Sequence, residues 1–257
     1  MTSRTVLFFI PGYLTGTAAQ SYNDLVVRPR SRNWDVEYFT IPNNNSGDIG
    51  NTTMEHCLEY IIRHYNMLES KFYADADIIL VGHGMGGLLV LRMMSEVVGH
   101  MISRKPSCVR VINPTIKPII PRHVRLFWTV LSLFPSIVRY LCLPIQVASY
   151  GAFYHGSPDF SPAVKQMLSI SLLCHTGSLY LHNTTWDLMP FLNARKVIEV
   201  YQSTNNRVVD VRSVREYCLD NRVPLIEIDS TYHQHVKDDV IDRIYSFSRS
   251  KCPIPAF

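Results

Sequence analysis

The 257-residue sequence has few charges and no close grouping of cysteines. Charged residues make up 18% of the chain and hydrophobic residues 47%, which is typical of a globular protein with a sizeable apolar core. Most of the six cysteines sit in apolar stretches, where a reduced thiol behaves as a small hydrophobe, and their spacing fits no zinc or redox motif. This pattern fits a reducing compartment or unpaired thiols, and we expect no metal and no cofactor.

An excess of positive charge is also nearly absent. The net charge is +4, and the only tight basic cluster is formed by Arg28, Arg30 and Arg32. Such a short cluster is typical of a solvated helix end, whereas nucleic-acid binding needs a broader basic surface. The composition therefore gives no support to a nucleic-acid partner.

The N-terminus lacks the pattern of a secretory signal. The apolar run Val6 to Ile10 is too short for a signal-peptide core, and Pro11 and Gly12 end it. We expect an intracellular protein that is not secreted, and we read the glycosylation sequons of this chain as chance. The organelle is left open, and association with a membrane, a mitochondrial one included, remains compatible with the sequence.

One apolar stretch approaches the length of a membrane span. It runs from Leu126 to Ile145, but Pro135 and Pro144 break helices and Arg139 is costly in a bilayer centre. The stretch favours two short helices that meet at Pro135. These helices would pack on the core, on a partner or on a membrane surface.

The order of patterns along the chain predicts an α/β fold. Apolar runs typical of strands alternate with amphipathic stretches typical of helices, which favours a mostly parallel sheet flanked by helices on both faces. The expected strands are Val6–Ile10, Asp35–Ile41, Ile78–Val81, Cys108–Ile112, Lys196–Tyr201 and Leu225–Ile228. The expected helices are Thr17–Val27, Thr53–Lys71, Gly86–Val98, Asp210–Asp220 and Val236–Phe247.

The alternation stops between Pro114 and Asn193. About eighty residues there read as helical or irregular and are unusually apolar. We therefore expect a core made of residues 1–114 and 194–257, with residues 115–193 inserted as an apolar helical cap or lid.

Residues 78–90 read Ile-Ile-Leu-Val-Gly-His-Gly-Met-Gly-Gly-Leu-Leu-Val, a buried strand, a glycine-rich turn and the start of a helix. This segment resembles the G-x-S-x-G nucleophile elbow of the α/β-hydrolase superfamily, and of its lipase- and esterase-like members in particular. The resemblance covers most of the chain outside the cap. It implies an α/β-hydrolase fold with the nucleophile at position 84, where this chain has glycine instead of serine.

Gly84 has no side chain that could attack a substrate. In the elbow, however, the nucleophile sits in a strained backbone conformation with positive φ, which costs a non-glycine residue about 1–3 kcal/mol. Glycine adopts that conformation freely, so we expect the turn to persist without the serine. The fold can therefore persist without catalytic activity.

The resemblance also implies an oxyanion hole. Residues Ile10 to Tyr13 occupy the place of the family's oxyanion loop, with Pro11 in place of a common histidine. By carry-over, the two backbone N–H donors belong to Tyr13 or Leu14 and to Met85. Backbone donors survive changes of side chain, so the hole itself can remain.

The other two triad positions follow the last two core strands. The best register places Asn206 at the acid position, where an amide cannot stabilise an imidazolium as a carboxylate does. Asp210 is the alternative acid, although a carboxylate there also suits the start of the next helix. His233 is in register for the base, with a loop histidine of no catalytic role as the alternative. His83, inside the elbow, reads as a packing or orienting residue.

These departures favour a catalytically inactive α/β-hydrolase-like protein that acts as a structural or interaction subunit of a larger, membrane-associated assembly. Its partners would be other protein subunits, and a lipid or membrane surface is a further candidate. Two alternatives remain open: an ester hydrolase in which Gly84 was introduced by mutation, and a lipid or small-molecule binder without turnover. The aromatic residues available for a partner or a lipid are Phe127, Trp128, Phe134 and Tyr140.

Overall fold

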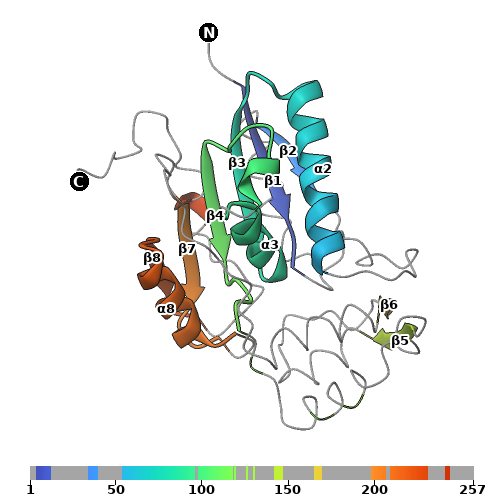
Figure 1. Cartoon of the computed structure of the whole chain (residues 1–257). Helices are drawn as coiled ribbons and strands as arrows, with labels where there is room; N and C mark the ends of the chain where they lie inside the picture. Colours follow the sequence, from blue (N-terminus) through green and yellow to red (C-terminus); the bar gives the residue numbers. More distant parts are fainter. Residues whose placement is uncertain are drawn as a thin grey trace.

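A computed structural model describes residues 4–12, 34–39, 54–95, 98–117, 119, 126, 130, 142–146, 165–169, 198–206, 209–230 and 241–243. In these residues, a parallel six-stranded sheet forms the centre of the molecule, and helices pack against it (Figure 1).

The central sheet has the strand order β2-β1-β3-β4-β7-β8. Its inner strands are buried on both faces and rich in valine and isoleucine, as parallel strands covered by helices usually are. Gly82 pairs with Ile10 on one side and with Val111 on the other, so the carboxyl ends of three strands lie side by side. The strands are β1 (Thr5–Ile10), β2 (Asp35–Tyr38), β3 (Asp77–His83), β4 (Cys108–Ile112), β7 (Ile198–Ser203) and β8 (Leu225–Ile228).

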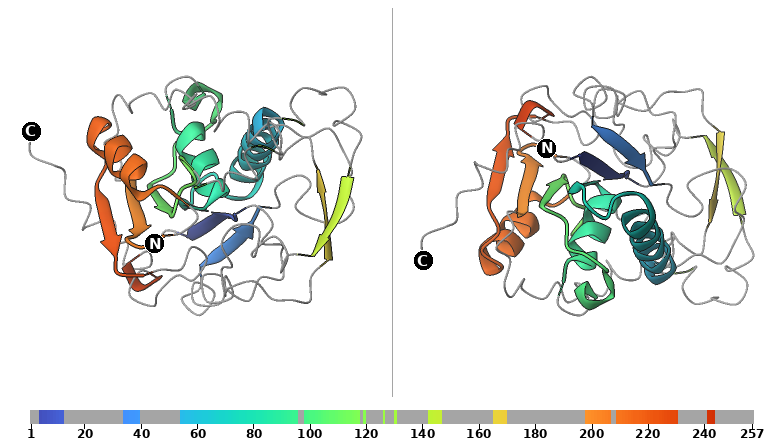
Figure 2. Two further views of the ribbon diagram at one scale, coloured as in Figure 1. Left: turned by 90° about the horizontal axis from the view of Figure 1, so that it is seen from below. Right: turned by 90° about the horizontal axis from the view of Figure 1, so that it is seen from above.

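Three helices cover one face of this sheet: α2 (Met54–Phe72), α3 (Met85–Met93) and α8 (Val211–Asp220). Viewed along the sheet, they lie on the same side of it (Figure 2). Their apolar side chains join those of the strands in one large core cluster, to which Tyr65 and Phe8 contribute an edge-to-face ring contact. The bounds of α2, 54–72, confirm the predicted amphipathic helix over 53–71 to within one residue at each end.

The second face of the sheet holds a smaller apolar cluster around Phe9, Val81 and Ile241. One ion pair lies within this face: Arg110 of β4 and Glu199 of β7 are register neighbours, with 3.3 Å between Nε and Oε2. Tyr201 donates a hydrogen bond of 2.6 Å to the same carboxylate. Burial and this bond raise the pKa of Tyr201 well above its ordinary value.

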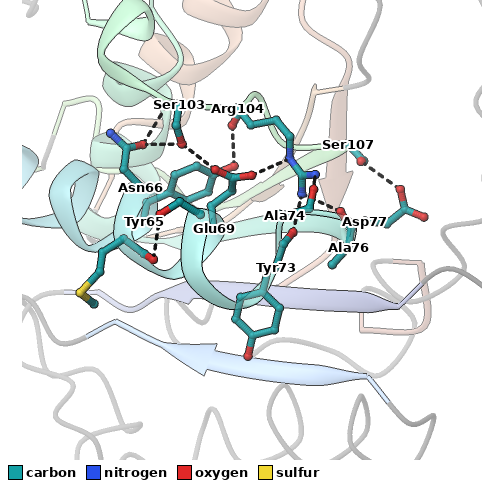
Figure 3. Close-up of polar contacts among 12 residues, drawn as sticks. Tyr65, Asn66, Glu69, Tyr73, Ala74, Ala76, Asp77, Ser103, Arg104 and Ser107 are labelled. Carbon is teal, nitrogen blue, oxygen red and sulfur yellow. Dashed lines mark hydrogen bonds and ion pairs between the residues drawn. The ribbon is translucent and has the colours of Figure 1, made fainter.

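A polar cluster joins α2 to the loop before β4, at the amino ends of the strands (Figure 3). The guanidinium of Arg104 donates hydrogen bonds to the carbonyl oxygens of Tyr73, Ala74 and Ala76, just beyond the end of α2. Its Nε lies 3.2 Å from a carboxylate oxygen of Glu69, a residue that is almost wholly buried. One side chain therefore binds three carbonyl groups of the turn that connects α2 to β3.

Neighbouring residues complete this cluster. Tyr65 donates a hydrogen bond of 2.8 Å to the carbonyl of Arg104, and Ser103 donates one of 2.8 Å to Glu69. The Oδ1 atom of Asn66 accepts from both the backbone and the side chain of Ser103. We call Tyr65, Asn66, Glu69, Ser103 and Arg104 the Arg104 cluster. It holds a loop onto a helix that precedes it by about thirty residues.

The prediction of a wholly helical or irregular cap is wrong in one respect. Strands β5 (Cys142–Gln146) and β6 (Lys165–Ser169) pair antiparallel inside the segment expected to lack strands. Their pairing joins segments about twenty residues apart, so no local sequence pattern predicts it. Pro144 cannot donate to a ladder, but a strand with an open edge tolerates proline. The β5–β6 pair lies beyond the carboxyl ends of the core strands (Figure 1).

Other expectations for the cap and the chain ends fall largely outside the described residues. Leu126 and Val130 are helical, while the proposed meeting point at Pro135 is not described. The expected helix over 17–27 is not described either, and that over 236–247 is described only at residues 241–243, which are helical. Among the residues that the structure describes, no helix has the length and apolar character needed to cross a membrane.

Candidate functional site

Gly84 stands at the sharp turn between β3 and α3. Its φ is 55° and its ψ is −119°, a conformation that side-chain-bearing residues rarely adopt. Among the described glycines it alone has a positive φ. The expected conformation of the elbow is therefore confirmed, and glycine occupies it without strain.

Backbone hydrogen bonds hold Gly84 from two sides. Its N–H donates to the carbonyl of Ile112 over 2.9 Å, and its carbonyl accepts from Thr115 over 3.1 Å and from Leu88 over 3.1 Å. Two of these contacts come from the end of β4 and the turn after it, and the third is the first turn of α3. The elbow is thus fixed by main-chain groups that do not depend on the side chain at position 84.

Close backbone approach explains the glycines around the turn. A Cβ atom on Gly86 would lie 2.2 Å from the carbonyl oxygen of Ile10 and 2.3 Å from that of Pro11. A Cβ on Gly82 would lie 2.7 Å from the carbonyl oxygen of Gly86. Helix α3 therefore presses directly against the end of β1, where the expected oxyanion loop begins.

Of the expected oxyanion donors, the structure describes one. Met85 is the first residue of α3 and is buried. Its N–H belongs to the first turn of the helix, whose amide groups have no acceptor within the helix. Tyr13 and Leu14 lie outside the described residues, so the pairing of two donors stays a prediction.

Asn206 follows β7 and is buried. Its side-chain Oδ1 accepts a hydrogen bond of 3.1 Å from the N–H of Val209, and its own N–H donates to the carbonyl of Ser203 over 3.3 Å. The amide therefore closes a turn, as asparagine often does. Strand β4 separates β7 from β3, so the ends of these two strands lie about 10 Å apart, two strand spacings.

Asp210 is the N-cap of α8. Its carboxylate accepts hydrogen bonds from the N–H of Arg212 at 3.1 Å and from the hydroxyl of Ser213 at 2.9 Å, and it lies 3.5 Å from the ammonium of Lys117. Burial by itself would raise the pKa of Asp210, but these hydrogen bonds and the charge of Lys117 outweigh it and lower the pKa. The expectation that Asp210 starts the helix is confirmed.

Asn113 is a residue of this region that the sequence reasoning missed. It has a φ of 45° and is buried at the end of β4. Its side-chain oxygen accepts from the N–H of Ser203 at 2.8 Å, and its own N–H donates to the carbonyl of Tyr201 at 2.8 Å. The signal was the pair Asn113-Pro114, because asparagine tolerates this conformation and proline ends a strand. Asn113 thereby ties β4 to β7 beside the elbow.

The remaining predicted residues divide into two groups. His83 is completely buried within β3, as expected of a packing residue. His233 lies outside the described residues, as do the four cap aromatics Phe127, Trp128, Phe134 and Tyr140. The structure thus positions Gly84, Asn206 and Asp210 at the carboxyl edge of the sheet and leaves the contact with the histidine a prediction. Within the described part of the chain, no group of three metal-binding side chains could hold a metal ion.

Solved structures of lipolytic enzymes are similar to this chain. A soluble variant of monoglyceride lipase from Saccharomyces cerevisiae, in complex with a substrate analogue, matches with a TM-score of 0.67 and 14% identity over 95% of this chain and 84% of that one. A monoacylglycerol lipase from Paleococcus ferrophilus matches with a TM-score of 0.63 and 15% identity, over 95% and 94%. A structure from work on the metagenome-derived lipolytic enzymes LipS and LipT matches with a TM-score of 0.63 and 15% identity, over 95% of this chain and 93% of that one.

No protein-family model matches the sequence, and no curated protein matches it either. The structural similarity extends over nearly the whole chain at low identity, so it establishes the fold. The chain has the α/β-hydrolase fold, with a parallel six-stranded sheet flanked by helices as in lipases and esterases.

Proposed function

We propose that this protein is a catalytically inactive α/β-hydrolase-like protein that acts as a structural or interaction subunit of a larger, membrane-associated assembly. One observation carries the proposal. At the turn between β3 and α3, the residue with positive φ is Gly84, which offers no nucleophilic atom. In hydrolases of this fold, the nucleophile, base and acid act as a unit, so the loss of one removes nearly all of their joint acceleration.

The acid position supports the same conclusion. Asn206 has no carboxylate, and its Oδ1 atom is engaged with the N–H of Val209. Asp210 is the alternative acid, but two donors of α8 and Lys117 already surround its carboxylate. Both side chains therefore have roles in shaping the loop after β7 and the start of α8 that require no histidine.

The retained frame supports a role as a scaffold. The bonds from Gly84 to Ile112 and Thr115 and the close packing at Gly86 involve main-chain atoms only. The turn therefore keeps its shape with no catalytic side chain. A protein of this kind can present its surface to partners while it lacks the chemistry of its fold.

Restoring the serine tests the catalytic half of the proposal. We expect Gly84→Ser to fold, with a free energy of unfolding lower by about 1–3 kcal/mol because serine is strained at positive φ. Neither this variant nor Gly84→Ser/Asn206→Asp should hydrolyse short-chain p-nitrophenyl esters above background. Gly99→Ser, changed at a glycine with ordinary contacts, is the matched control.

A rate that appears in Gly84→Ser, and disappears again when His233→Ala is added, would contradict the proposal. It would instead favour an ester hydrolase in which glycine was introduced at position 84. The assembly half of the proposal is tested by the native size of the full chain isolated from its source. We expect a defined particle larger than the 29.5 kDa monomer, and a monodisperse monomer would argue against a subunit role.

A further inference from the structure

Strand β8 is the outermost strand on one side of the central sheet (Figure 2). The carbonyl oxygens of Pro224 and Ile228 accept hydrogen bonds of 2.9 Å from the chain of β7 and the residue after it, so the main chain at these positions faces inward. Because main-chain groups alternate in direction along a strand, the N–H and C=O groups of Leu225 and Glu227 point outward. No strand that the structure describes pairs with them. These donors and acceptors are therefore open to a strand of another chain.

One antiparallel register pairs both outward-pointing residues of β8 with a second copy of the same strand. With Ile226 on the two-fold axis, Leu225 of each copy lies opposite Glu227 of the other, and each such pair exchanges two main-chain hydrogen bonds. The two Ile226 side chains then face each other as a β-branched pair. An axis at Glu227 would instead place two carboxylates opposite each other. An axis at Leu225 would place Glu227 opposite Val223, whose N–H already donates to the carbonyl of Cys218.

Strand β2, on the other side of the sheet, is less suited to such pairing. The N–H of Phe39 donates to the carbonyl of Phe9, so the main chain of Phe39 and Glu37 faces β1. The outward-pointing residues of β2 are therefore Val36 and Tyr38. The register that pairs both of them with a second copy would place two Glu37 carboxylates directly opposite each other, which is destabilising.

Helix α8 exposes an apolar side chain beside β8. Leu219 is 79% exposed, more than any other large apolar side chain in the described part of the chain. It lies four residues after Arg215, whose guanidinium pairs with Glu227 of β8, so both residues lie on the flank of α8 that is turned toward β8. The two-fold axis of an antiparallel strand pair is perpendicular to the sheet, so a second copy would place its own α8 on the same face. Pairing at β8 would therefore bring the two α8 helices together and cover Leu219.

We propose that two copies of this chain associate through β8 and α8, so that their two sheets join into one. The main-chain groups of Leu225 and Glu227 set the register, and Leu219 contributes apolar surface that association removes from water. A contact of one strand and one helix from each copy is small, so the dimer should be weak and reversible. The inference goes beyond the proposed function, because it needs no second kind of subunit and holds whether or not the elbow is catalytic.

Sedimentation velocity of the purified full chain over a range of concentrations tests the association. We expect a reversible equilibrium between the 29.5 kDa monomer and a dimer. A chain that stays monomeric at every concentration would overturn the inference. That result would leave the size of the particle isolated from the source, and the outcome of the ester assay, as separate questions, so the two proposals can fail independently.

Two substitutions at Leu225 test the register. Leu225→Glu places a carboxylate opposite Glu227 of the second copy, whereas Leu225→Lys places a cation there. Both replace the same half-buried leucine with a charged residue, so they share any cost to the fold, which thermal unfolding measures. We expect the dissociation constant of Leu225→Glu to exceed that of Leu225→Lys at least about ten-fold. Equal constants would overturn the proposed pairing.

Leu219→Asp tests the contribution of α8. It should raise the dissociation constant at least about ten-fold, because it places a charge where the two helices meet. Met67→Asp is the matched control, since Met67 is also an exposed apolar residue of a helix, 38% exposed, but lies on α2. Its dissociation constant should stay within about two-fold of that of the unchanged chain. A dimer that Leu219→Asp weakens no more than Met67→Asp does would contradict the proposal.

Discussion

The two ends of the strands in the central sheet, which we call the amino edge and the carboxyl edge, are held by different kinds of contact. At the amino edge, the Arg104 cluster joins a loop to α2 through side chains, among them an ion pair with the buried Glu69. At the carboxyl edge, Gly84 is held by main-chain hydrogen bonds to Ile112 and Thr115, and α3 approaches β1 with no side chain between them at Gly86.

This difference predicts how each edge responds to substitutions. An edge that side chains hold together is weakened when one of them is shortened. The turn at Gly84, which is built on main-chain bonds and close approach, does not depend on a side chain at its centre but is sensitive to added atoms. Gly84 lies at the second edge, and the main-chain bonds that hold it support the turn without a side chain at this position.

The largest effect is expected from an atom added at the carboxyl edge. Gly86→Ala would place a Cβ atom 2.2 Å from the carbonyl oxygen of Ile10, the last residue of β1, and 2.3 Å from that of Pro11. Because main-chain atoms cannot rotate away as a side chain can, α3 and β1 must move apart. We expect a loss of about 3 kcal/mol or more in the free energy of unfolding, measured by urea denaturation.

Gly99→Ala is the control for this substitution. A Cβ there would meet its nearest neighbours at 3.6–3.8 Å, which is ordinary van der Waals contact. Its effect should stay within about 1 kcal/mol, with stabilisation as the favoured sign because alanine restricts the unfolded chain. If both alanine variants proved equally stable, the close packing at the elbow could not be what supports this edge.

A lost side chain should matter more at the amino edge. Arg104→Met removes the cation beside Glu69, whose side chain is 9% exposed. It also takes one donor from each of three carbonyl groups, of which that of Tyr73 still accepts from the N–H of Ala76. Breaking a buried ion pair costs about 3–5 kcal/mol, but Arg104 is itself one-third exposed. We therefore expect a loss of about 2–3 kcal/mol in urea denaturation.

Arg215→Met is the matched control, since Arg215 forms an ion pair with Glu227 in which both partners are exposed. Exposed pairs contribute little, so its effect should be much smaller than that of Arg104→Met. Equal losses in the two variants would mean that the Arg104 cluster stabilises the edge no more than a surface ion pair does.

Local patterns in the sequence were sufficient for the core elements and for the turn. The strands Cys108–Ile112 and Leu225–Ile228 have their predicted bounds, because apolar runs and turn residues delimit them locally. Gly84 has the predicted positive φ, and Asp210 begins α8 as its position before the helix suggested. Each of these features depends on residues within a few positions of one another.

Features that join distant segments could not be predicted in the same way. Arg104 reaches residues that precede it by about thirty positions, and nothing in Ser103-Arg104-Lys105 indicates which carbonyl groups it contacts. The β5–β6 pairing and the bond from Ser203 to Asn113 are likewise decided by tertiary contacts. The candidate site was therefore predictable where the chain is continuous, and not where separate loops meet.

The smallest expected effect concerns Asp210, the charged residue that caps α8. The pKa of Asp210 is lowered in the folded protein, so its ionised form stabilises the fold. This contribution is fully present above the ordinary pKa of 3.8 and is lost as the pH falls through the lowered value. Asp210→Asn keeps a capping oxygen but not the charge, so we expect a loss of about 0.5–1 kcal/mol at pH 7.

The difference between Asp210→Asn and the unchanged chain should disappear in acid, because the aspartate is then protonated and resembles the amide. Urea denaturation at pH 7 and at acidic pH measures this change. Asp220→Asn, at the opposite end of α8, is the control: a carboxylate there opposes the helix dipole, so its removal should be neutral or slightly stabilising at pH 7. If instead Asp210→Asn had no effect on stability at pH 7, the charge of Asp210 would contribute nothing to the cap beyond what its oxygen supplies.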